Sequence, residues 1–286
     1  MYTELTYEQL TKLKEIELAM FKEFIAVCEK LNIKYYLLGG TLLGAVRHKG
    51  FIPWDDDIDV GLLREDYEKF IAHAQELLPE KYFVQNFRTD PEFPTNITKI
   101  RNSHTTFREN SIKNCNVNHG VFIDVFPLDY YPEDVKKQKA IERKKKRLLI
   151  RIIFPSFSFS SRKKAIAAKI ISAAIKMMHP FSTYRDAVKI REKLYSSTKK
   201  SAYIANHSGA WGEKEIVPAE WYGEGCILEF EGMKVIAPAQ YDNWLTRVYG
   251  DYMTLPPEEK RIARHHIDVF DLEKPYTVYT KKEKRK

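Results

Sequence analysis

Cysteine is scarce in this sequence, and no long apolar run is present in it. The three cysteines, Cys28, Cys115 and Cys226, are far apart and show neither a CxxC pair nor a Cys/His spacing. The sequence therefore predicts neither a disulfide framework nor a zinc site. No segment approaches the roughly 20 apolar residues that span a bilayer, and the N-terminus lacks the basic start and apolar core of a signal peptide. We therefore expect a cytoplasmic protein.

Charge of both signs is abundant but unevenly distributed. The 286 residues carry a net charge of +8, and 44% of them are hydrophobic, which is enough for a sizeable core. Residues 136–200 contain 20 Lys and Arg against 3 Asp and Glu, a local net charge of +17, so the remainder of the chain carries −9. The composition indicates a globular protein with an acidic body and one strongly basic segment.

Periodic patterns predict the order of helices and strands. Thr6 and Gln9 form a capping box before an amphipathic helix that ends near Asn32. A second helix is capped by Asp66 and stopped by Pro79. A short helix is expected at 41–47, and strands are expected at 34–38, 58–63, 82–87, 97–101 and 121–126. This order indicates an α/β or α+β sheet with helices packed on it.

The chain divides into three regions. Residues 1–135 form a sheet-containing core, residues 136–200 a basic helical region, and residues 201–286 a C-terminal part with a hairpin around Glu231-Gly232 and a disordered basic tail. In the basic region, the helical spacing over 165–178 places six apolar residues on one side: Ile166, Ile170, Ile171, Ala174, Ile175 and Met178.

Two aspartates two residues apart are the strongest indication of chemistry. In an extended strand, Asp57 and Asp59 project to the same face, while Ile58 and Val60 point into a core. Adjacent carboxylates repel each other unless a cation lies between them, and Mg²⁺ prefers one or two carboxylates completed by phosphate and water oxygens. The alternative is that this acidic cluster only caps a loop.

Two further features favour the metal-binding interpretation. Gly39, Gly40 and Thr41 follow the preceding strand, and such a turn lets the backbone approach a phosphate while Thr41 offers a hydroxyl group. Asp124 lies in the apolar segment 121–126, where a carboxylate is costly without a partner. A metal shared with the aspartate pair is one partner, and a salt bridge or a cap is the alternative.

These residues and their neighbours resemble the LicD family of phosphotransferases, which are bacterial relatives of the fukutin-related enzymes. The compound motif is highly specific, and the similarity spans most of the chain. The zinc-binding cysteine cluster of the fukutin-related branch is absent, which favours the bacterial branch. The residues that carry the resemblance are 40–47, 52–59, Arg64, Asp66, Tyr67, Phe70, Lys99, Arg101, Thr105 or Thr106, Asp124, 249–252, Pro256 and Pro257.

The resemblance implies an α+β, nucleotidyltransferase-like catalytic core in which a mixed sheet is flanked by helices. It also implies dependence on Mg²⁺, or on Mn²⁺ in its place, and transfer of phosphocholine from CDP-choline to a hydroxyl of a glycan or lipid-linked glycan precursor, of the teichoic acid or lipopolysaccharide type, with release of CMP. Asp57, Asp59 and Asp124 would be the catalytic residues and metal ligands, and Asp124 would also accept the proton of the acceptor hydroxyl.

Several basic and aromatic residues are expected to bind the substrate. Arg47, Lys99 and Arg101 are suited to holding the diphosphate, although a surface ion pair is the alternative for each. Choline offers no hydrogen-bond donor, so its recognition depends on aromatic faces such as Trp54; Trp211, Trp221 and Tyr222 are further candidates. Of the adjacent histidines 265 and 266, we assign His266 to substrate binding.

Other activities and partners are compatible with parts of the sequence. The donor could carry another alcohol phosphate such as ribitol phosphate, or the enzyme could transfer a nucleotidyl group and release pyrophosphate. A non-enzymatic nucleic-acid-binding module is the alternative suggested by the basic segment, but no nucleic-acid-binding signature accompanies it. Its apolar helical faces are better suited to an anionic membrane surface, which would place the protein at the inner face of the plasma membrane.

Overall fold

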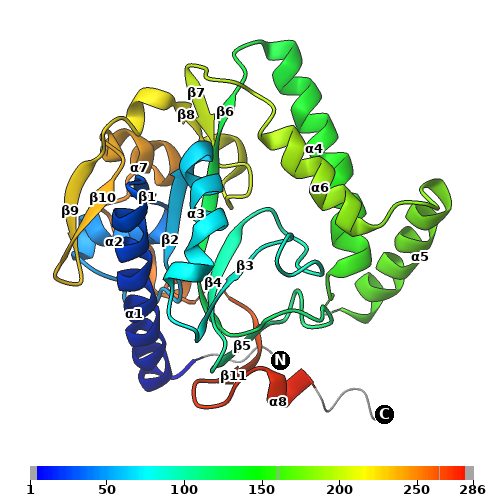
Figure 1. Cartoon of the computed structure of the whole chain (residues 1–286), viewed down its shortest axis with the longest axis horizontal. Coiled ribbons are helices and arrows are strands. Elements are labelled where there is room, and N and C mark those ends of the chain that lie inside the picture. The colour runs from blue at the N-terminus through cyan, green and yellow to red at the C-terminus, as the bar shows by residue number, and fades with distance from the viewer. Residues whose placement is uncertain (1–4, 160, 264, 281–286) are drawn as a thin grey trace.

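The computed structural model describes residues 5–159, 161–263 and 265–280, and these form a mixed sheet with helices on its faces and a helical layer beside it (Figure 1). The helices are α1 (Tyr7–Leu31), α2 (Gly39–His48), α3 (Arg64–Leu77), α4 (Val135–Ser156), α5 (Arg162–Met178), α6 (Tyr184–Tyr195), α7 (Tyr241–Tyr249) and α8 (Thr277–Thr280). The strands are β1 (Tyr35–Leu37), β2 (Asp59–Leu63), β3 (Tyr82–Gln85), β4 (Thr98–Asn102), β5 (Thr106–Glu109), β6 (Val121–Tyr131), β7 (Tyr203–Ala205), β8 (Ile216–Pro218), β9 (Cys226–Phe230), β10 (Met233–Ala237) and β11 (Ile267–Asp271). The predicted α+β class is confirmed.

The main sheet is built around β6, its longest strand. The order is β1-β2-β6-β4-β3, in which β2 and β6 run parallel and the other neighbours are antiparallel. The far end of β6 pairs with β7, which in turn pairs with β8. Seven of the first nine residues of β6 are apolar, the exceptions being Asp124 and Asp129, and all nine are buried. This strand is buried on both faces because helices cover one side and later segments cover the other.

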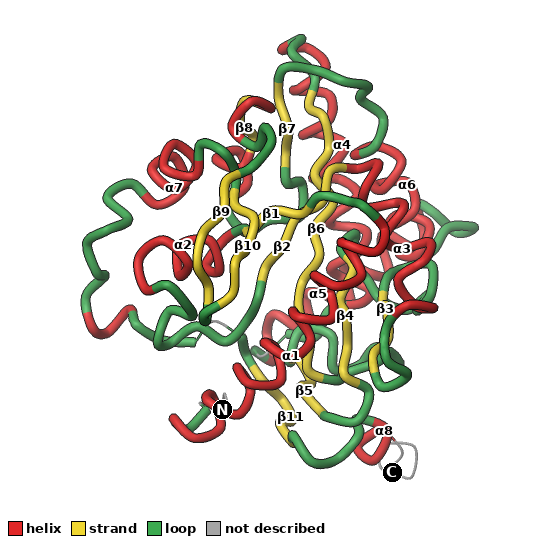
Figure 2. The backbone as a smooth tube through the Cα atoms, turned by 60° about the vertical axis from the view of Figure 1, so that its left-hand side comes forward, coloured by secondary structure: helices red, strands yellow, loops and turns green. Residues whose placement is uncertain are grey.

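Helices α1 and α3 pack against each other and against the sheet, as the tube view in Figure 2 also shows. The predicted capping box of α1 is confirmed, since the Thr6 hydroxyl accepts from the Gln9 amide and the Gln9 side chain accepts from the Thr6 amide. The helix ends at Asn32 in a left-handed conformation. The predicted cap of α3 is wrong: the helix begins at Arg64, and the Asp66 carboxylate instead accepts from the Lys34 amide, tying α3 to the start of β1.

The basic region forms the helices α4, α5 and α6, in agreement with the prediction. Its attachment to the sheet includes a buried ion network. The Arg64 guanidinium donates from Nε and Nη2 to both carboxylate oxygens of Asp129 on β6, at 2.7 and 2.6 Å, and from Nη1 to Glu192 on α6. Because Asp129 and Glu192 are 1% and 6% exposed, this arginine neutralises two buried charges and connects three elements.

The C-terminal residues return to the core and close around it. The predicted hairpin at 231–232 is confirmed as the β9–β10 pair, which packs beside β1. β11 pairs with β5, although more than 150 residues separate them in sequence. The predicted disordered tail falls largely on residues 281–286, which lie outside the described residues, and the three predicted region boundaries stay predictions. In the part of the chain that the structure describes, no helix is long and apolar enough to cross a membrane.

Candidate active site

A cavity of about 820 Å³ opens where β2 begins beside β6. This volume is in the range that holds a small organic ligand. The first turn of α2, the loop before β2 and strands β4 to β6 form one wall. Residues from the segments 206–215 and 249–260, together with His265, also line the cavity. Residues that are distant in sequence thus surround one space.

Two predicted catalytic aspartates lie on adjacent strands of this cavity. Asp59 is the first residue of β2, and in the parallel β2–β6 pair it is the register partner of Asp124. Ile58 and Val60 are fully buried, as the alternation predicted. Asp57 lies in the loop just before the strand and lines the same cavity. All three predicted carboxylates therefore line one cavity, although only Asp59 and Asp124 belong to the sheet.

The Gly39-Gly40 pair makes room for carboxylates. The predicted short helix begins at Gly39, two residues earlier than expected, so both glycines belong to the first turn of α2. A Cβ atom on Gly39 would lie 2.6 Å from Oδ2 of Asp59, and one on Gly40 would lie 2.2 Å from Oδ2 of Asp55. Gly39 also has φ +54°, a left-handed conformation that favours glycine. Side chains at these positions would displace the acidic groups.

The half-buried carboxylates of Asp57 and Asp59 hold their protons more strongly than ordinary aspartates. Burial, followed by the charges of Asp57 and Asp124, raises the pKa of Asp59 well above its usual range. Burial also raises the pKa of Asp57 to about 6, although His265 opposes this. Both shifts arise first from burial and then from neighbouring carboxylates, which disfavour the charged form. A cation bound between the carboxylates would favour the charged form again.

Lysine and arginine side chains lie on the β4 side of the cavity. The Lys99 ammonium lies 3.1 Å from Oδ1 of Asp124 and 3.4 Å from Oε1 of Glu109. Behind it, the fully buried Arg101 donates to Glu109, to the Gln85 side chain and to a backbone carbonyl. Burial alone would raise the pKa of Glu109, but Lys99 and Arg101 together lower it to about 2. Glu109 is therefore ionised, and the salt-bridge alternative for Asp124 is realised with Lys99.

His265 connects the C-terminal segment to the acidic loop, which is formed by residues 55–57 before β2. Its amide and Nδ1 lie 3.3 and 3.2 Å from the carboxylate oxygens of the buried Asp56. Its ring packs edge-on against Phe107 and Phe122. Burial opposes protonation of the ring, but the hydrogen bond to Asp56 and the charge of Asp57 raise the pKa of His265 to about 9. At neutral pH it is an imidazolium.

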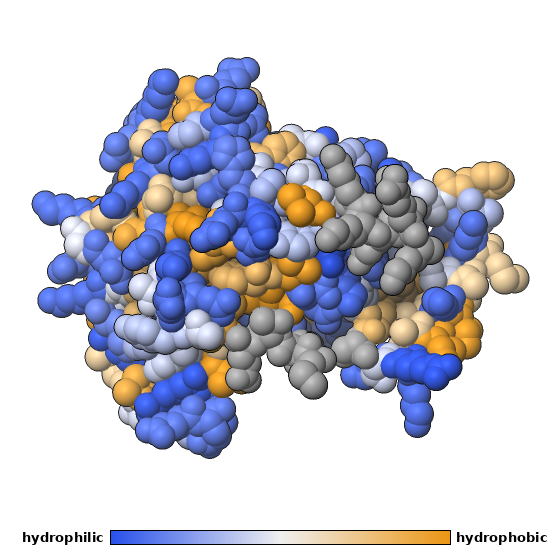
Figure 3. Space-filling model, turned by 90° about the horizontal axis from the view of Figure 1, so that it is seen from below, coloured by the Kyte–Doolittle hydropathy of each residue, from blue (hydrophilic) through white to orange (hydrophobic). Residues whose placement is uncertain are grey.

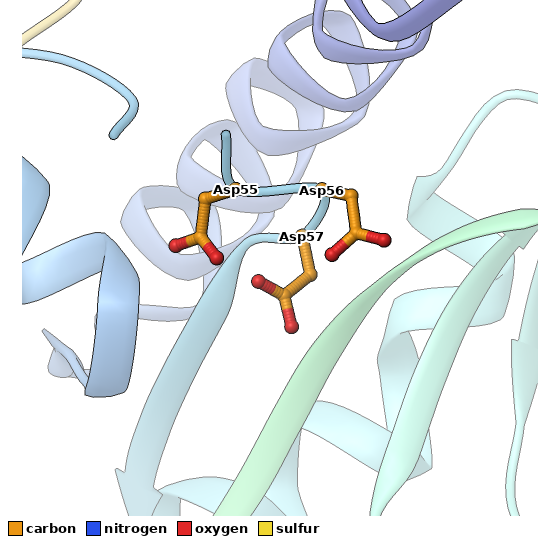
Figure 4. Close-up of side chains that lie close together, drawn as sticks. All are labelled: Asp55, Asp56 and Asp57. Carbon is orange, nitrogen blue, oxygen red and sulfur yellow. The ribbon is translucent and has the colours of Figure 1, made fainter. Parts of the chain in front are cut away.

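Three consecutive aspartates form a close group of candidate oxygen ligands. Within the described ranges, Asp55, Asp56 and Asp57 are the group of His, Cys, Asp or Glu residues whose candidate ligand atoms lie within 4.8 Å of one another. Figure 4 shows the three carboxylates pointing to the same side of the loop. The predicted ligand set, which combines Asp57 with Asp59 and Asp124, is not brought within that distance. Asp57 belongs to both sets.

The structure brings most of the predicted binding residues to the cavity, but not all of them. Of the predicted binding residues, five line the cavity: Gly39, Gly40, Arg47, Trp54 and Lys99.

Three predicted binding residues do not line it. The Thr41 hydroxyl is buried and accepts from the Asp59 amide. Arg101 is enclosed by its partners, as described above. His266 is exposed, and its carbonyl accepts from the Asn110 amide. Thr41 and Arg101 thus hold Asp59 and Glu109, which line the cavity, and do not line it themselves.

Other lining residues were not predicted from the sequence. Glu109 carries no local signal, because its strand was not expected and only tertiary contacts bring it to Lys99. His265 lines the cavity, whereas the predicted residue was its neighbour His266. In extended backbone, adjacent side chains face opposite ways, so choosing the wrong one of the two placed the prediction on the outer side. Tyr249 and Tyr252 lie in a segment used only for the family resemblance, yet both line the cavity.

Comparisons with known proteins show which family the chain belongs to. The sequence model described as "LicD/FKTN/FKRP, nucleotidyltransferase domain" matches residues 32–168. The chain is 32% identical over 252 residues to the lipopolysaccharide cholinephosphotransferase LicD of Haemophilus influenzae, which covers 85% of this chain and 91% of that protein. It is also 50% identical over 73 residues to the ribitol 5-phosphate transferase FKRP of mouse and of human, covering 24% of this chain and 15% of FKRP. The chain therefore belongs to the LicD family.

Proposed function

We propose that this LicD-family phosphotransferase moves phosphocholine from CDP-choline to a hydroxyl of a lipopolysaccharide-type glycan and releases CMP. The observation that carries the proposal is the meeting of Asp57, Asp59 and Asp124 with the first turn of α2 at one cavity. The name of the Haemophilus relative, similar over nearly its whole length, supports the choline and glycan assignments. A teichoic-acid-type acceptor presents the same hydroxyl chemistry.

The acidic loop suits Mg²⁺, with Mn²⁺ as a substitute. Its donor set consists of carboxylate oxygens alone, which hard divalent cations prefer. Burial, and after it the neighbouring carboxylates, raise the pKa values of Asp57 and Asp59, and a bound cation would offset this penalty. Asp57 and Asp59 would hold the ion, with Asp55 beside them. When bound, it would neutralise charge that develops on the diphosphate as CMP leaves.

The N-terminus of α2 and the Arg47 side chain are suited to binding the phosphates of the donor. The first amides of a helix have no partner within it and attract anions, and α2 has no side-chain cap at its start. Arg47, on the last turn of the same helix, lines the cavity while its Nη1 donates to the Tyr252 carbonyl at 2.7 Å. The diphosphate would thus lie between these groups and the acidic loop.

Asp124 is suited to act on the acceptor hydroxyl. Its carboxylate accepts from Lys99, which fixes its orientation towards the cavity. In our proposal it accepts the proton of the attacking hydroxyl as the oxygen bonds to phosphorus, a role that requires hydrogen-bonding reach. Thr41 supports this arrangement indirectly, because its hydroxyl holds the amide of Asp59 on the neighbouring strand.

An aromatic corner is suited to the quaternary ammonium of choline. Trp211 and Tyr249 line the cavity with ring centroids 5.0 Å apart, and Glu215 and Asp251 line the cavity with them. Aromatic faces together with carboxylates attract quaternary ammonium groups. Trp221 is not among the residues that line the cavity, so it serves as a control.

The donor can be tested by thermal shift and product analysis. CDP-choline should raise the melting temperature with Mg²⁺ and much less with EDTA, because a ligand that binds only the native state stabilises it. Trp211→Ala should weaken this shift for CDP-choline but not for CDP, and Trp221→Ala should weaken neither. Transfer to a lipopolysaccharide acceptor should release CMP.

Two results would contradict the proposal at different levels. If CDP-ribitol or CDP-glycerol is turned over while CDP-choline is not, the phosphotransferase chemistry stands and the choline assignment is wrong. The partial similarity to FKRP makes ribitol phosphate the relevant alternative. If a nucleoside triphosphate is consumed with release of pyrophosphate while CDP-choline stays intact, the reaction is nucleotidylyl transfer instead.

A further inference from the structure

Helix α5 has two apolar faces, and only one of them is covered. Ala168 and Ile175 are buried at 4% and 8% exposure and face the rest of the protein. On the opposite side of the helix, Ile166, Ile170 and Met177 are 53%, 66% and 83% exposed. At 3.6 residues per turn these three lie within an arc of about 40°. The single apolar side predicted from the spacing is therefore wrong in detail, because the residues divide between a buried face and an outer stripe.

More exposed apolar side chains gather at the C-terminal end of α5, beside this stripe. Met178 is 68% exposed, and Phe181 is fully exposed in the turn that leads to α6. In Figure 1, α5 lies at the right-hand edge, farthest from the sheet, and Figure 3 shows hydrophobic surface beside hydrophilic surface at that end of the molecule. Solvent-facing apolar residues in such a row are unusual on a soluble helix, whose outer face is normally polar.

Positive charge borders this stripe. By helical position, Lys169 and Lys176 follow one side of it and Lys163 the other, and all three are exposed. The neighbouring α4 exposes further lysines, and residues 136–200 as a whole carry +17. An apolar row bordered by lysines is the pattern of a helix that lies in the plane of a membrane interface.

The positive charge of this region distinguishes between two possible partners of the exposed apolar stripe, a second copy of the chain and a lipid surface. A second copy of this chain would bring its own positive segment against this one, and like charges oppose such a contact. An anionic lipid surface offers both components, since its headgroups attract the lysines and its chains accept the apolar side chains. We propose that α5 lies on an anionic membrane, with Ile166, Ile170 and Met177 inserted below the headgroups. This proposal is independent of the identity of the donor.

The test is sedimentation of the whole protein with vesicles. We expect binding to vesicles of equal parts phosphatidylglycerol and phosphatidylcholine, little binding to phosphatidylcholine alone, and a decrease when salt is added. The double variant Ile170→Ser/Met177→Ser should lower the partition coefficient at least tenfold. Tyr7→Ser/Ile227→Ser removes two side chains of similar exposure, 87% and 61%, from other elements and should bind like the wild type.

Specific outcomes would overturn the proposal. If the wild type ignores phosphatidylglycerol vesicles at low salt, or if the α5 double variant binds them like the wild type, α5 is not the contact. If that variant changes the sedimentation coefficient without lipid, the stripe is an interface between copies of the chain. If an acidic soluble protein binds the stripe and the vesicles do not, the partner is a protein. Circular dichroism confirms that each variant is folded before binding is measured.

Discussion

Replacing Gly39 by alanine tests whether the first turn of α2 and the acidic loop fit each other as the structure indicates. The new Cβ would lie 2.6 Å from Oδ2 of Asp59, whereas ordinary contact begins at 3.4 Å, so the carboxylate must move by about 0.8 Å. A displacement near 1 Å at a reacting centre costs up to about 100-fold in rate. We expect Gly39→Ala to lower turnover on the order of 10- to 100-fold.

The same substitution also has a backbone cost that must be separated from the effect on the site. Gly39 has φ +54°, and placing alanine in a left-handed conformation costs about 1–2 kcal/mol, which lowers the melting temperature by a few degrees. Gly232 has φ +73° in the β9–β10 turn, and a Cβ there would meet nothing within 4 Å. Gly232→Ala is therefore the matched control: it should lose similar stability and keep its activity.

Turnover is measured as CMP release from CDP-choline with Mg²⁺, and the free energy of unfolding by urea titration. The reasoning requires that Gly39→Ala lose activity beyond the Gly232→Ala control. Equal turnover of the two folded variants would refute the proposed contact between Gly39 and Asp59.

Three further substitutions probe charge. Asp59→Asn should reduce turnover by about 100-fold or more yet leave the metal-free protein as stable or more stable, because burial penalises this carboxylate; near-normal CMP release would disprove the assignment. Arg64→Met should lower the free energy of unfolding by about 3–5 kcal/mol, because it leaves buried Asp129 without an ion-pair partner and removes the nearer cation from Glu192; a urea titration showing under about 1 kcal/mol would contradict this. Burial raises the pKa of Glu17 well above its usual value. As pH rises above that usual value, the unfolded state loses a proton that the native state keeps, so the stability of the wild type falls. Glu17→Gln should therefore be more stable than the wild type, by a margin that grows between pH 5 and pH 8; a constant margin would show that Glu17 does not titrate as inferred.

Local patterns were sufficient for much of the fold. The capping box of α1, the alternation around Ile58 and Val60, and the apolar segment of β6 each depend on interactions between residues that are close in sequence. Such interactions are expressed in periodicity and turn chemistry. At the site, the spacing of Asp57 and Asp59 predicted that both would face the same side; both line the cavity, although Asp57 lies in the loop before β2.

The amino-acid sequence alone therefore determined the order of most elements, the acidic loop, the segregation of positive charge and the family. Tertiary structure decided which side chains face the cavity: Arg101 turns inward to Glu109, and His265 lies there in place of His266. It also decided that one apolar face of α5 is buried and the other is exposed. These outcomes depend on contacts between residues up to about 200 positions apart, such as His265 with Asp56. Their free energy comes from burial and charge pairing in the assembled fold, and no local pattern in the chain encodes it.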